Sequence, residues 1–296
     1  MNCNTVVLPF GKHIVFKISF FIRKRSDVTR NDFRTYWQGE HADLNLAYVR
    51  DIGVKQYIKC EVLKDHPLTK ASVTSYRTGP VSYDFVDQWI FNDIEDLKRG
   101  MADSRIQSLA SKTHLSEDNW IDLPHSSVHM STDLVQFYPV DAARIRATSD
   151  DPYLKVFYHV RSLPHISRES AQLHWNACHG GESRQHIHLS KHKKYLQAHK
   201  IDSTFVDQLT ELRGYEDDPT IIGHAEAWLI ADAEEKQPTA EEREANSMTL
   251  DDIDLFTDKS RSNVFLTNES FLLDDTIVTR PTGGGKRMPE FFSAIY

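Results

Sequence analysis

The pattern that decides the expected fold occurs twice, as TRNDFRTYWQGEH over residues 29–41 and as SRESAQLHWNACH over residues 167–179. Each copy has a hydroxyl residue followed by Arg, and then a Trp and a His four positions apart. The two copies lie 138 positions apart without a gap. Because an internal repeat of this length indicates a duplicated structural unit, the 296-residue chain is expected to contain two similar halves.

The order of elements expected in each half is β-α-β-β-α-β. Apolar runs rich in β-branched and aromatic residues predict the strands, and Thr29 and Ser167 have the residue type that caps a helix N-terminus, which predicts a helix after each. The further elements expected are strands over residues 13–22, 54–62, 85–91 and about 118–130 with a helix over 94 to about 115, and, in the second half, strands over 154–160, 194–199, 224–230 and about 275–279 with a helix over 250 to about 272. This is the ferredoxin-like order, so the expected fold class is α+β, with two ferredoxin-like repeats.

The expected boundaries follow from the repeat. They give a first repeat over residues 1–138, a linker over 139–152, a second repeat over 153–280 and a C-terminal tail over 281–296. Residues 231–247 are expected to be an acidic, solvent-exposed insertion that only the second copy contains. Between Asp232 and Asp254 there are nine acidic and two basic residues, which accounts for most of the net charge of -8.

Composition limits the classes of function. Outside the acidic segment the chain is nearly neutral, so no nucleic-acid partner is expected. No run of about 20 apolar residues is present, so no membrane partner is expected either. The three cysteines are widely spaced and form no Cys-x-x-Cys motif, which favours a cytoplasmic location. The expected partner is therefore a small-molecule substrate.

The first copy resembles a known family. The residues from Arg23 to Ala42 are similar to the first helix of an EthD domain, with a basic strand end, a Thr cap, an aromatic residue, a Trp, and a His followed by a small residue. The resemblance extends over residues 13–125 and is weaker over residues 153–280, where Gly180-Gly181 follows the His. It implies a dimeric α+β barrel, here closed within one chain as an internal pseudo-dimer. A monomer of this kind and a homodimer both remain open.

Two histidines are the leading catalytic candidates. His41 and His179 could transfer a proton near neutral pH, because an imidazole titrates near pH 6.5. Tyr57 and Tyr195 open the second strand of each half, and a phenol there could donate to the oxygen of an enolate. For each of these residues a purely structural role in the core or at a helix end is the alternative.

Other residues are candidates for binding the substrate. His159 stands in an apolar strand where the first copy has Phe21, which could mark the second half as the active one. The full set of expected substrate-binding residues is Trp37, Trp175, His159, Tyr158, Phe33, Trp89 and Trp228. No metal ligand motif or nucleotide-binding glycine motif with the required spacing is present, so neither a metal nor a cofactor is expected.

The resemblance suggests a class of reaction. The superfamily of the EthD domain includes cofactor-free cyclases, decarboxylases, dehydratases, isomerases and small quinone-forming monooxygenases, so the fold does not select one of them. The expectation is a cofactor-independent lyase, cyclase or isomerase of secondary metabolism that uses histidine acid–base chemistry on a small, apolar, oxygenated polyketide, aromatic or lactone substrate. The alternatives are a cofactor-free monooxygenase acting on a phenol and a protein that only binds a hydrophobic ligand.

Overall fold

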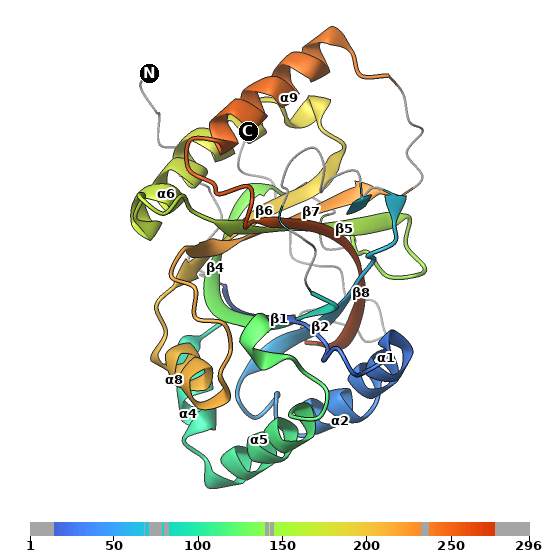
Figure 1. Ribbon diagram of the computed structural model, residues 1–296, viewed down its shortest axis with the longest axis vertical. Helices are drawn as coiled ribbons and strands as arrows, with labels where there is room; N and C mark the ends of the chain where they lie inside the picture. Colours follow the sequence, from blue (N-terminus) through green and yellow to red (C-terminus); the bar gives the residue numbers. More distant parts are fainter. Residues whose placement is uncertain are drawn as a thin grey trace, which may run out of the picture.

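The computed structural model describes residues 15–67, 69–70, 79, 83–139, 142, 145–231 and 237–275. Within these residues, eight antiparallel strands form a closed barrel (Figure 1). The strands are β1 (Phe16–Ile22), β2 (Val54–Val62), β3 (Phe85–Phe91), β4 (Ser127–Phe137), β5 (Tyr153–Arg161), β6 (His192–Ile201), β7 (Ile221–Ile230) and β8 (Asn263–Asp274). The α+β architecture expected from the sequence, an antiparallel sheet with helices, is confirmed.

Helices cover the outside of the barrel. They are α1 (Arg30–Gln38), α2 (Glu40–Leu46), α4 (Ile94–Met101), α5 (Ser104–Glu117), α6 (Arg168–His174), α7 (Gly180–Gln185), α8 (Thr204–Arg213) and α9 (Ala240–Ile253), with a π-helical turn over Trp175–His179. Among the described residues, no helix is both long and apolar enough to cross a membrane.

The barrel consists of two four-stranded parts, one from each half of the chain. The strand order is β4-β1-β3-β2 in the first part and β8-β5-β7-β6 in the second. The parts join edge to edge, where β2 pairs with β8 (Cys60 opposite Glu269) and β4 pairs with β6 (Thr132 opposite His199). Both edges of each part are thereby hydrogen-bonded, so no strand of the barrel has an open edge.

The repeat of 138 positions extends through the strands. Strands β2 and β6 begin at Val54 and His192, which lie 138 positions apart, the same offset as between Trp37 and Trp175. Helices α5 and α9 both contain 14 residues and precede the last strand of their halves. Residues 240–247 of the acidic segment therefore belong to α9, the counterpart of α5, and the expectation that they are an insertion is wrong.

Several predicted boundaries need correction. The helix expected over 250–272 is wrong, since α9 ends at Ile253 and Asn263–Asp274 is strand β8. A capping box starts α9, because the Thr239 side chain accepts from the backbone N–H of Glu242 while Glu242 accepts from that of Thr239. The last strand of the first half is β4 rather than residues 118–130. Residues 13–14, most of the strand expected over 275–279, and the tail over 281–296 lie outside the described residues.

Each strand has one side toward the helices and one toward the barrel interior. In β1, Ile18 and Phe20 belong to the apolar cluster beneath the helices of the first half. Lys17 alternates to the other side, where its Nζ lies 2.6 Å from the carboxylate of Glu226 in β7. Because β1 and β7 are not neighbours in the barrel, this contact crosses the interior. The interior thus contains charged groups beside an apolar cluster that includes Phe21, Phe157 and Phe265, whereas the layer between sheet and helices is mostly apolar.

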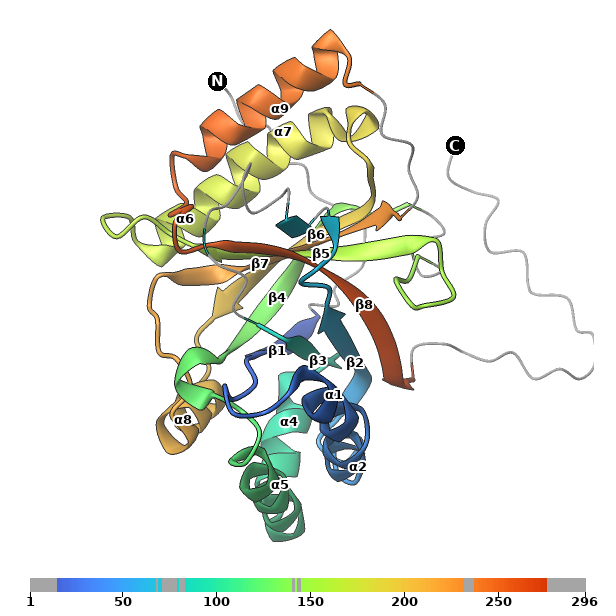
Figure 2. The ribbon, with the colours of Figure 1, turned by 45° about the vertical axis from the view of Figure 1, so that its right-hand side comes forward.

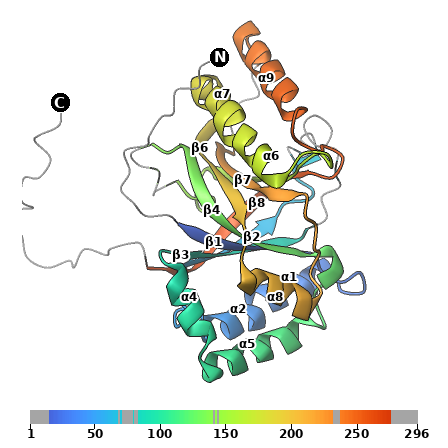
Figure 3. The ribbon, with the colours of Figure 1, turned by 90° about the vertical axis from the view of Figure 1, so that its left-hand side faces the viewer.

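One helix of the second half lies with the helices of the first. Figures 1, 2 and 3 show α1, α2, α4 and α5 on one side of the barrel and α6, α7 and α9 on the other. Helix α8 lies on the side of the first-half helices and contacts β4. The helices on the first-half sheet therefore include α8 from the second half, and α8 forms part of the candidate site.

Candidate functional site

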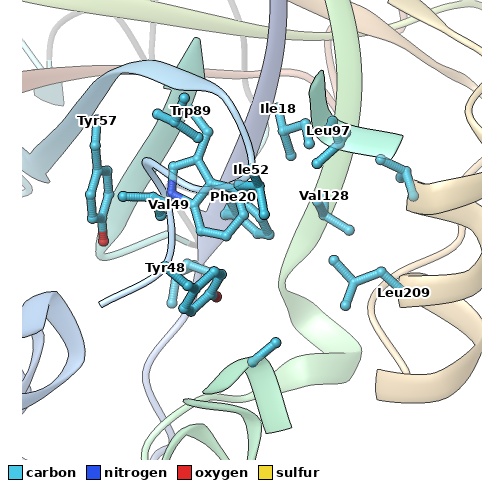
Figure 4. Packing of buried hydrophobic residues seen from close by; sticks show 14 of the residues in the cluster. Ile18, Phe20, Tyr48, Val49, Ile52, Tyr57, Trp89, Leu97, Val128 and Leu209 are labelled. Atoms are coloured by element: carbon cyan, nitrogen blue, oxygen red, sulfur yellow. The ribbon is translucent and has the colours of Figure 1, made fainter. Parts of the chain in front are cut away.

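A pocket lies between the first-half sheet and the helices that cover it. Its volume is about 590 Å³, including the open mouth. The lining is mostly aromatic and aliphatic, with a few polar groups, which is typical of small-molecule sites. The lining residues are Phe20, Ile22, Trp37, His41, Asn45, Tyr48, Asp87, Trp89, Met101, Ala110, Thr113, His114, Glu117, Phe205, Leu209 and Tyr215. Figure 4 shows part of this apolar layer, with Phe20, Tyr48 and Trp89 close together.

His41 lies on the pocket wall, near the start of α2. Thr29 caps α1 as the sequence predicts, and α1 ends at Gly39, where the backbone leaves helical geometry (φ -101°, ψ -101°) before α2 begins. This break leaves the His41 ring stacked on Trp37, with ring centroids 3.7 Å apart. His41 is buried, and burial together with the nearby Lys59 ammonium lowers its pKa well below 6.5. The imidazole is therefore neutral at neutral pH.

Both ring nitrogens of His41 have partners. Lys59 Nζ lies 3.0 Å from Nδ1, and Glu117 Oε1 lies 3.0 Å from Nε2. A lysine ammonium can only donate, so Nδ1 is the acceptor and the ring proton is on Nε2. His41 consequently donates to Glu117. Burial lowers the pKa of Lys59 to about 8, which leaves it mainly charged at pH 7 and maintains this tautomer.

Asp87 joins the residues behind His41. Its Oδ1 accepts from Trp37 Nε1 at 2.9 Å, and its Oδ2 accepts from the Tyr57 hydroxyl at 2.8 Å and lies 3.8 Å from Lys59 Nζ. The strand register places Lys59 directly opposite Asp87 on β2 and β3. Lys59 also donates to the backbone carbonyl of Trp37. Trp37, Tyr57 and Lys59 are thus fixed around one carboxylate.

Glu117 is the acidic group that faces His41. It is the last residue of α5, on the same buried face as Ile106, Ala110 and Thr113. Burial raises its pKa to about 7, although the charge of Arg213 acts in the opposite direction. Sequence reasoning missed this residue. The sequence signal for Glu117 is its spacing. It follows Thr113 by four positions and so continues the buried face that Ile106, Ala110 and Thr113 form.

The second half lacks the equivalent charges. At the positions of Lys59 and Asp87 stand Gln197 and Ala225, which face each other in the register of β6 and β7. Helix α9 ends at Ile253, where its counterpart α5 ends at Glu117, and the carboxylate of α9 that meets the His is Asp252. The two halves therefore have the same strand order but differ in the Lys59–Asp87 pair.

The second copy of the His has different partners. His179 Nδ1 lies 2.9 Å from Asp252 Oδ2, and His174 Nε2 lies 2.7 Å from Oδ1 of the same carboxylate. Trp175 stacks on His199 at a centroid distance of 4.8 Å rather than on the His one turn later. The π-helical turn at Trp175–His179 replaces the glycine break of the first half, which changes the direction of His179.

The structure brings together some of the predicted site residues and separates others. Trp37, His41 and Trp89 line the first-half pocket, and Phe33 stacks behind Trp37 at 5.3 Å. Tyr57 lies behind the pocket, where it donates to Asp87, and the remaining predicted residues belong to the second half. Tyr158, Trp175 and Tyr195 pack in its apolar cluster, whereas His159 and Trp228 face the barrel interior, where the Trp228 indole donates to Glu269 at 3.0 Å.

The part of the chain that the structure describes contains no group of three or more His, Cys, Asp or Glu residues arranged to hold a metal ion.

Comparison with solved structures finds distant likeness along most of the chain. A provisionally assigned monooxygenase from Lactobacillus acidophilus NCFM has 10% identity and a TM-score of 0.42, over 89% of this chain and 97% of that one. A second, from Fusobacterium nucleatum subsp. nucleatum ATCC 25586, has 7% identity and a TM-score of 0.43, over 87% and 93%. A provisionally assigned chlorite dismutase has 11% identity and a TM-score of 0.44, over 88% and 96%.

Comparison by sequence is more specific for one part of the chain. No curated protein matches the chain. The EthD domain family matches residues 25–124, a range that contains Trp37, His41, Lys59, Asp87 and Glu117. The first half of this chain therefore contains an EthD domain over residues 25–124.

Proposed function

We propose that the first-half pocket is the active site of an enzyme that transfers a proton on a small, neutral, mostly apolar oxygenated molecule. One observation carries the proposal: the buried His41 donates through Nε2 to Glu117 at 3.0 Å on the wall of an apolar pocket. The reaction class is a lyase, cyclase or isomerase step that begins with removal of a proton next to a carbonyl. The proposal invokes no cofactor.

In this proposal Glu117 is the general base. Its pKa of about 7 suits an acid–base catalyst at neutral pH, because the carboxylate is then available without being too weak a base. His41 holds the carboxylate in place through its Nε2–H, and Lys59 fixes the tautomer of His41. This assignment refines the hypothesis from the sequence, in which His41 itself takes the proton.

The charges of the pocket favour a neutral substrate. Two carboxyl residues, Asp87 and Glu117, are among the lining residues, whereas no Lys or Arg side chain is. Asp87 is compensated by Lys59, but an anionic substrate would meet the carboxylate of Glu117 and would find no Lys or Arg among the lining residues to bind it. A ketone, phenol or lactone is therefore favoured over a carboxylic acid, and decarboxylation is the least favoured of the candidate reactions.

We also infer that the two halves are tandem ferredoxin-like repeats, with boundaries near residues 138 and 153. The matching strand orders β4-β1-β3-β2 and β8-β5-β7-β6 support this inference. On this basis the second half is a partner domain that retains the fold, and its Gln197 and Ala225 stand where the charged pair would be.

The test is proton exchange in D₂O. The protein is incubated with a panel of neutral aryl ketones, β-diketones and lactones, and the replacement of the α-hydrogen by deuterium is followed by NMR. Glu117→Gln is expected to slow the exchange about 100-fold or more, the usual contribution of a general base. The matched control is Asp252→Asn, which alters the carboxylate beside His179. Unchanged exchange in Glu117→Gln would refute the proposal.

The oxygenase alternative uses the same base. A phenol in the pocket could lose its proton to Glu117, and the resulting electron-rich phenolate could react with dioxygen between Trp37 and Trp89. Uptake of oxygen during turnover of a phenol, measured with an oxygen electrode, would favour this alternative over the lyase or isomerase.

A further inference from the structure

We infer that the second half of the chain contributes a substrate-binding residue, Tyr215, to the pocket of the first half. Its hydroxyl would donate a hydrogen bond to the carbonyl oxygen of the substrate and to the negative oxygen that forms when the adjacent proton is removed. This inference rests on the proposed function only in taking the pocket as the site of the substrate.

Helix α8 brings this residue to the pocket. The helix lies on the side of the first-half helices (Figures 1 and 3), and its Phe205 and Leu209 are part of the pocket wall. Figure 4 shows Leu209 in the same cluster as Phe20 and Val128 of the first-half strands. The pocket is therefore complete only when both halves are present.

The chain around Tyr215 is anchored to the first half on both sides. Before it, Arg213 donates to the backbone carbonyl of His114 at 2.9 Å and pairs with Asp118 at 2.7 Å, both at the end of α5. After it, the backbone N–H of Glu216 donates to Ser126 at 2.8 Å. Gly214, at φ +73°, ends α8 in the left-handed region and turns the chain between these anchors. Tyr215 is therefore held in position by contacts to the other half.

The hydroxyl of Tyr215 is available to a ligand. Tyr48 donates to Asn45 and Tyr57 donates to Asp87, both within the protein. For Tyr215, by contrast, the hydrogen bonds among the described residues include none to its hydroxyl, and the residue lines the pocket. Burial and the neighbouring charge of Glu117 raise the pKa of Tyr215 well above 10, so the phenol keeps its proton and can donate.

Tyr215 and Glu117 line the same pocket, which gives this donor a chemical role. When a base removes a proton next to a carbonyl, the electron pair of the C–H bond moves toward the carbonyl and the negative charge develops on oxygen. A donor aimed at that oxygen stabilises the charge in a site from which water is excluded. Glu117 and Tyr215 would thus act on adjacent atoms of the same substrate, one from each half of the chain.

The test measures binding, with two aromatic probes that differ only in the acceptor. The probes are 2-acetylnaphthalene, which has a carbonyl, and 2-ethylnaphthalene, which does not, and their dissociation constants are obtained from naphthalene fluorescence. Tyr215→Phe is expected to weaken binding of the ketone roughly 5- to 10-fold, as for loss of one hydrogen bond, and to change binding of the hydrocarbon less than about twofold. Tyr153→Phe, a half-buried tyrosine of β5 outside the pocket, is the matched control.

A second measurement does not depend on the variant folding. With a ¹³C-labelled carbonyl, the bound ketone in the unaltered protein is expected to show the downfield ¹³C shift of a hydrogen-bonded carbonyl. Equal effects of Tyr215→Phe on both probes, an unshifted carbonyl, or absence of binding of both probes to the unaltered protein would overturn the inference. Because binding is measured without turnover, a loss specific to the ketone would stand even if Glu117→Gln left proton exchange intact.

Discussion

The two halves of this chain have the same order of strands, and each has a Trp and a His four residues apart, but their surroundings differ. In the first half the His contacts Lys59 and Glu117 beside a pocket, whereas in the second half it pairs with Asp252, which also holds His174. The difference shows that the repeated Trp and His accompany the helix but do not by themselves determine which residues they contact. The chemistry of the site depends on residues that are not repeated.

The second half keeps the Trp and the His but not the charged pair of the first half. Lys59 and Asp87 are buried and face each other, so each compensates the other's desolvation. In the second half both charges are gone, and the neutral pair Gln197 and Ala225 needs no such compensation. Replacing only Lys59 or only Asp87 would leave one buried charge without its partner and lower the stability of the fold. The two residues are therefore expected to be replaced together.

The largest expected effect comes from making the first half resemble the second at one position only. Asp87→Ala leaves Lys59 buried and without its carboxylate, and removes the acceptor of Trp37 and Tyr57. We expect the free energy of unfolding to fall by about 3–5 kcal/mol, the usual result of breaking a buried ion pair. Urea unfolding followed by tryptophan fluorescence measures this loss.

A double variant sharpens the comparison. Lys59→Gln with Asp87→Ala reproduces the pair Gln197 and Ala225 of the second half, and it removes the unpaired charge. We expect it to be more stable than Asp87→Ala alone. A double variant as unstable as the single one, or a single variant that loses less than about 1 kcal/mol, would show that the two residues do not depend on each other.

The next effect concerns activity and separates the two histidines. His41→Ala removes the donor that orients Glu117, so we expect the rate of proton exchange to fall about 100-fold. His179→Ala is expected to change the rate less than about twofold, because His179 does not line the pocket and Gln197 and Ala225 replace the charged pair in that half. The measurement is the NMR exchange assay at pH 7.5. Equal losses in the two variants would contradict the assignment of the site to the first half.

Much of the fold could be predicted from the sequence, because strand signals are local. The runs over residues 54–62 and 85–91 coincide with β2 and β3, since alternating β-branched and aromatic residues are typical of strands between two packed layers. The acidic run, of which residues 240–247 lie in α9, does not identify a helix by its charge, because charged residues occur both in loops and on exposed helix faces. Its capping residues Thr239 and Glu242 were the better signal.

The site was harder to predict than the fold. The contact between Lys59 and Asp87 depends on the register of two strands, and the contact between His41 and Glu117 joins residues 76 positions apart. Neither distance can be derived from local periodicity. The same applies to Tyr215, which reaches the first-half pocket only because α8 crosses to the other side of the barrel.

The pH dependence of the reaction is expected to follow the ionisation of Glu117 in the first-half pocket. As a base, Glu117 is active when deprotonated, so the exchange rate is expected to rise with pH around its pKa of about 7. Arg213 of the second half lies 3.4 Å from this carboxylate and lowers its pKa. Removing that charge by Arg213→Gln should therefore move the rising limb upward, by about 1 pH unit.

The control for this shift is Asp252→Asn. Hydrogen bonds from His179 and His174 outweigh burial and lower the pKa of Asp252, so this carboxylate is already ionised across the neutral range. We expect the variant to leave the pH profile unchanged. A rising limb that stays in place in Arg213→Gln would mean that Glu117 is not the group that sets it.

The smallest expected effect concerns the barrel interior, where the halves also differ. His159 takes the place of Phe21 and lies against it, with ring centroids 4.4 Å apart. Burial and the charge of Arg161 lower the pKa of His159 well below 6.5. Below pH 6.5 the unfolded chain therefore binds a proton at this residue that the folded protein does not, so stability decreases as the pH falls.

The variant His159→Phe gives both halves the same residue and removes this contribution. The other buried groups, including Glu117, whose raised pKa acts in the opposite direction, are present in both proteins and cancel in the comparison. We expect the decrease in Tm between pH 7.5 and pH 5.5 to be smaller in the variant by roughly 2–4 °C, the shift that about 1 kcal/mol produces in a protein of this size. His165→Gln, at an exposed position of the same half, is the control. An equal decrease in all three proteins would show that His159 is not protonated on unfolding.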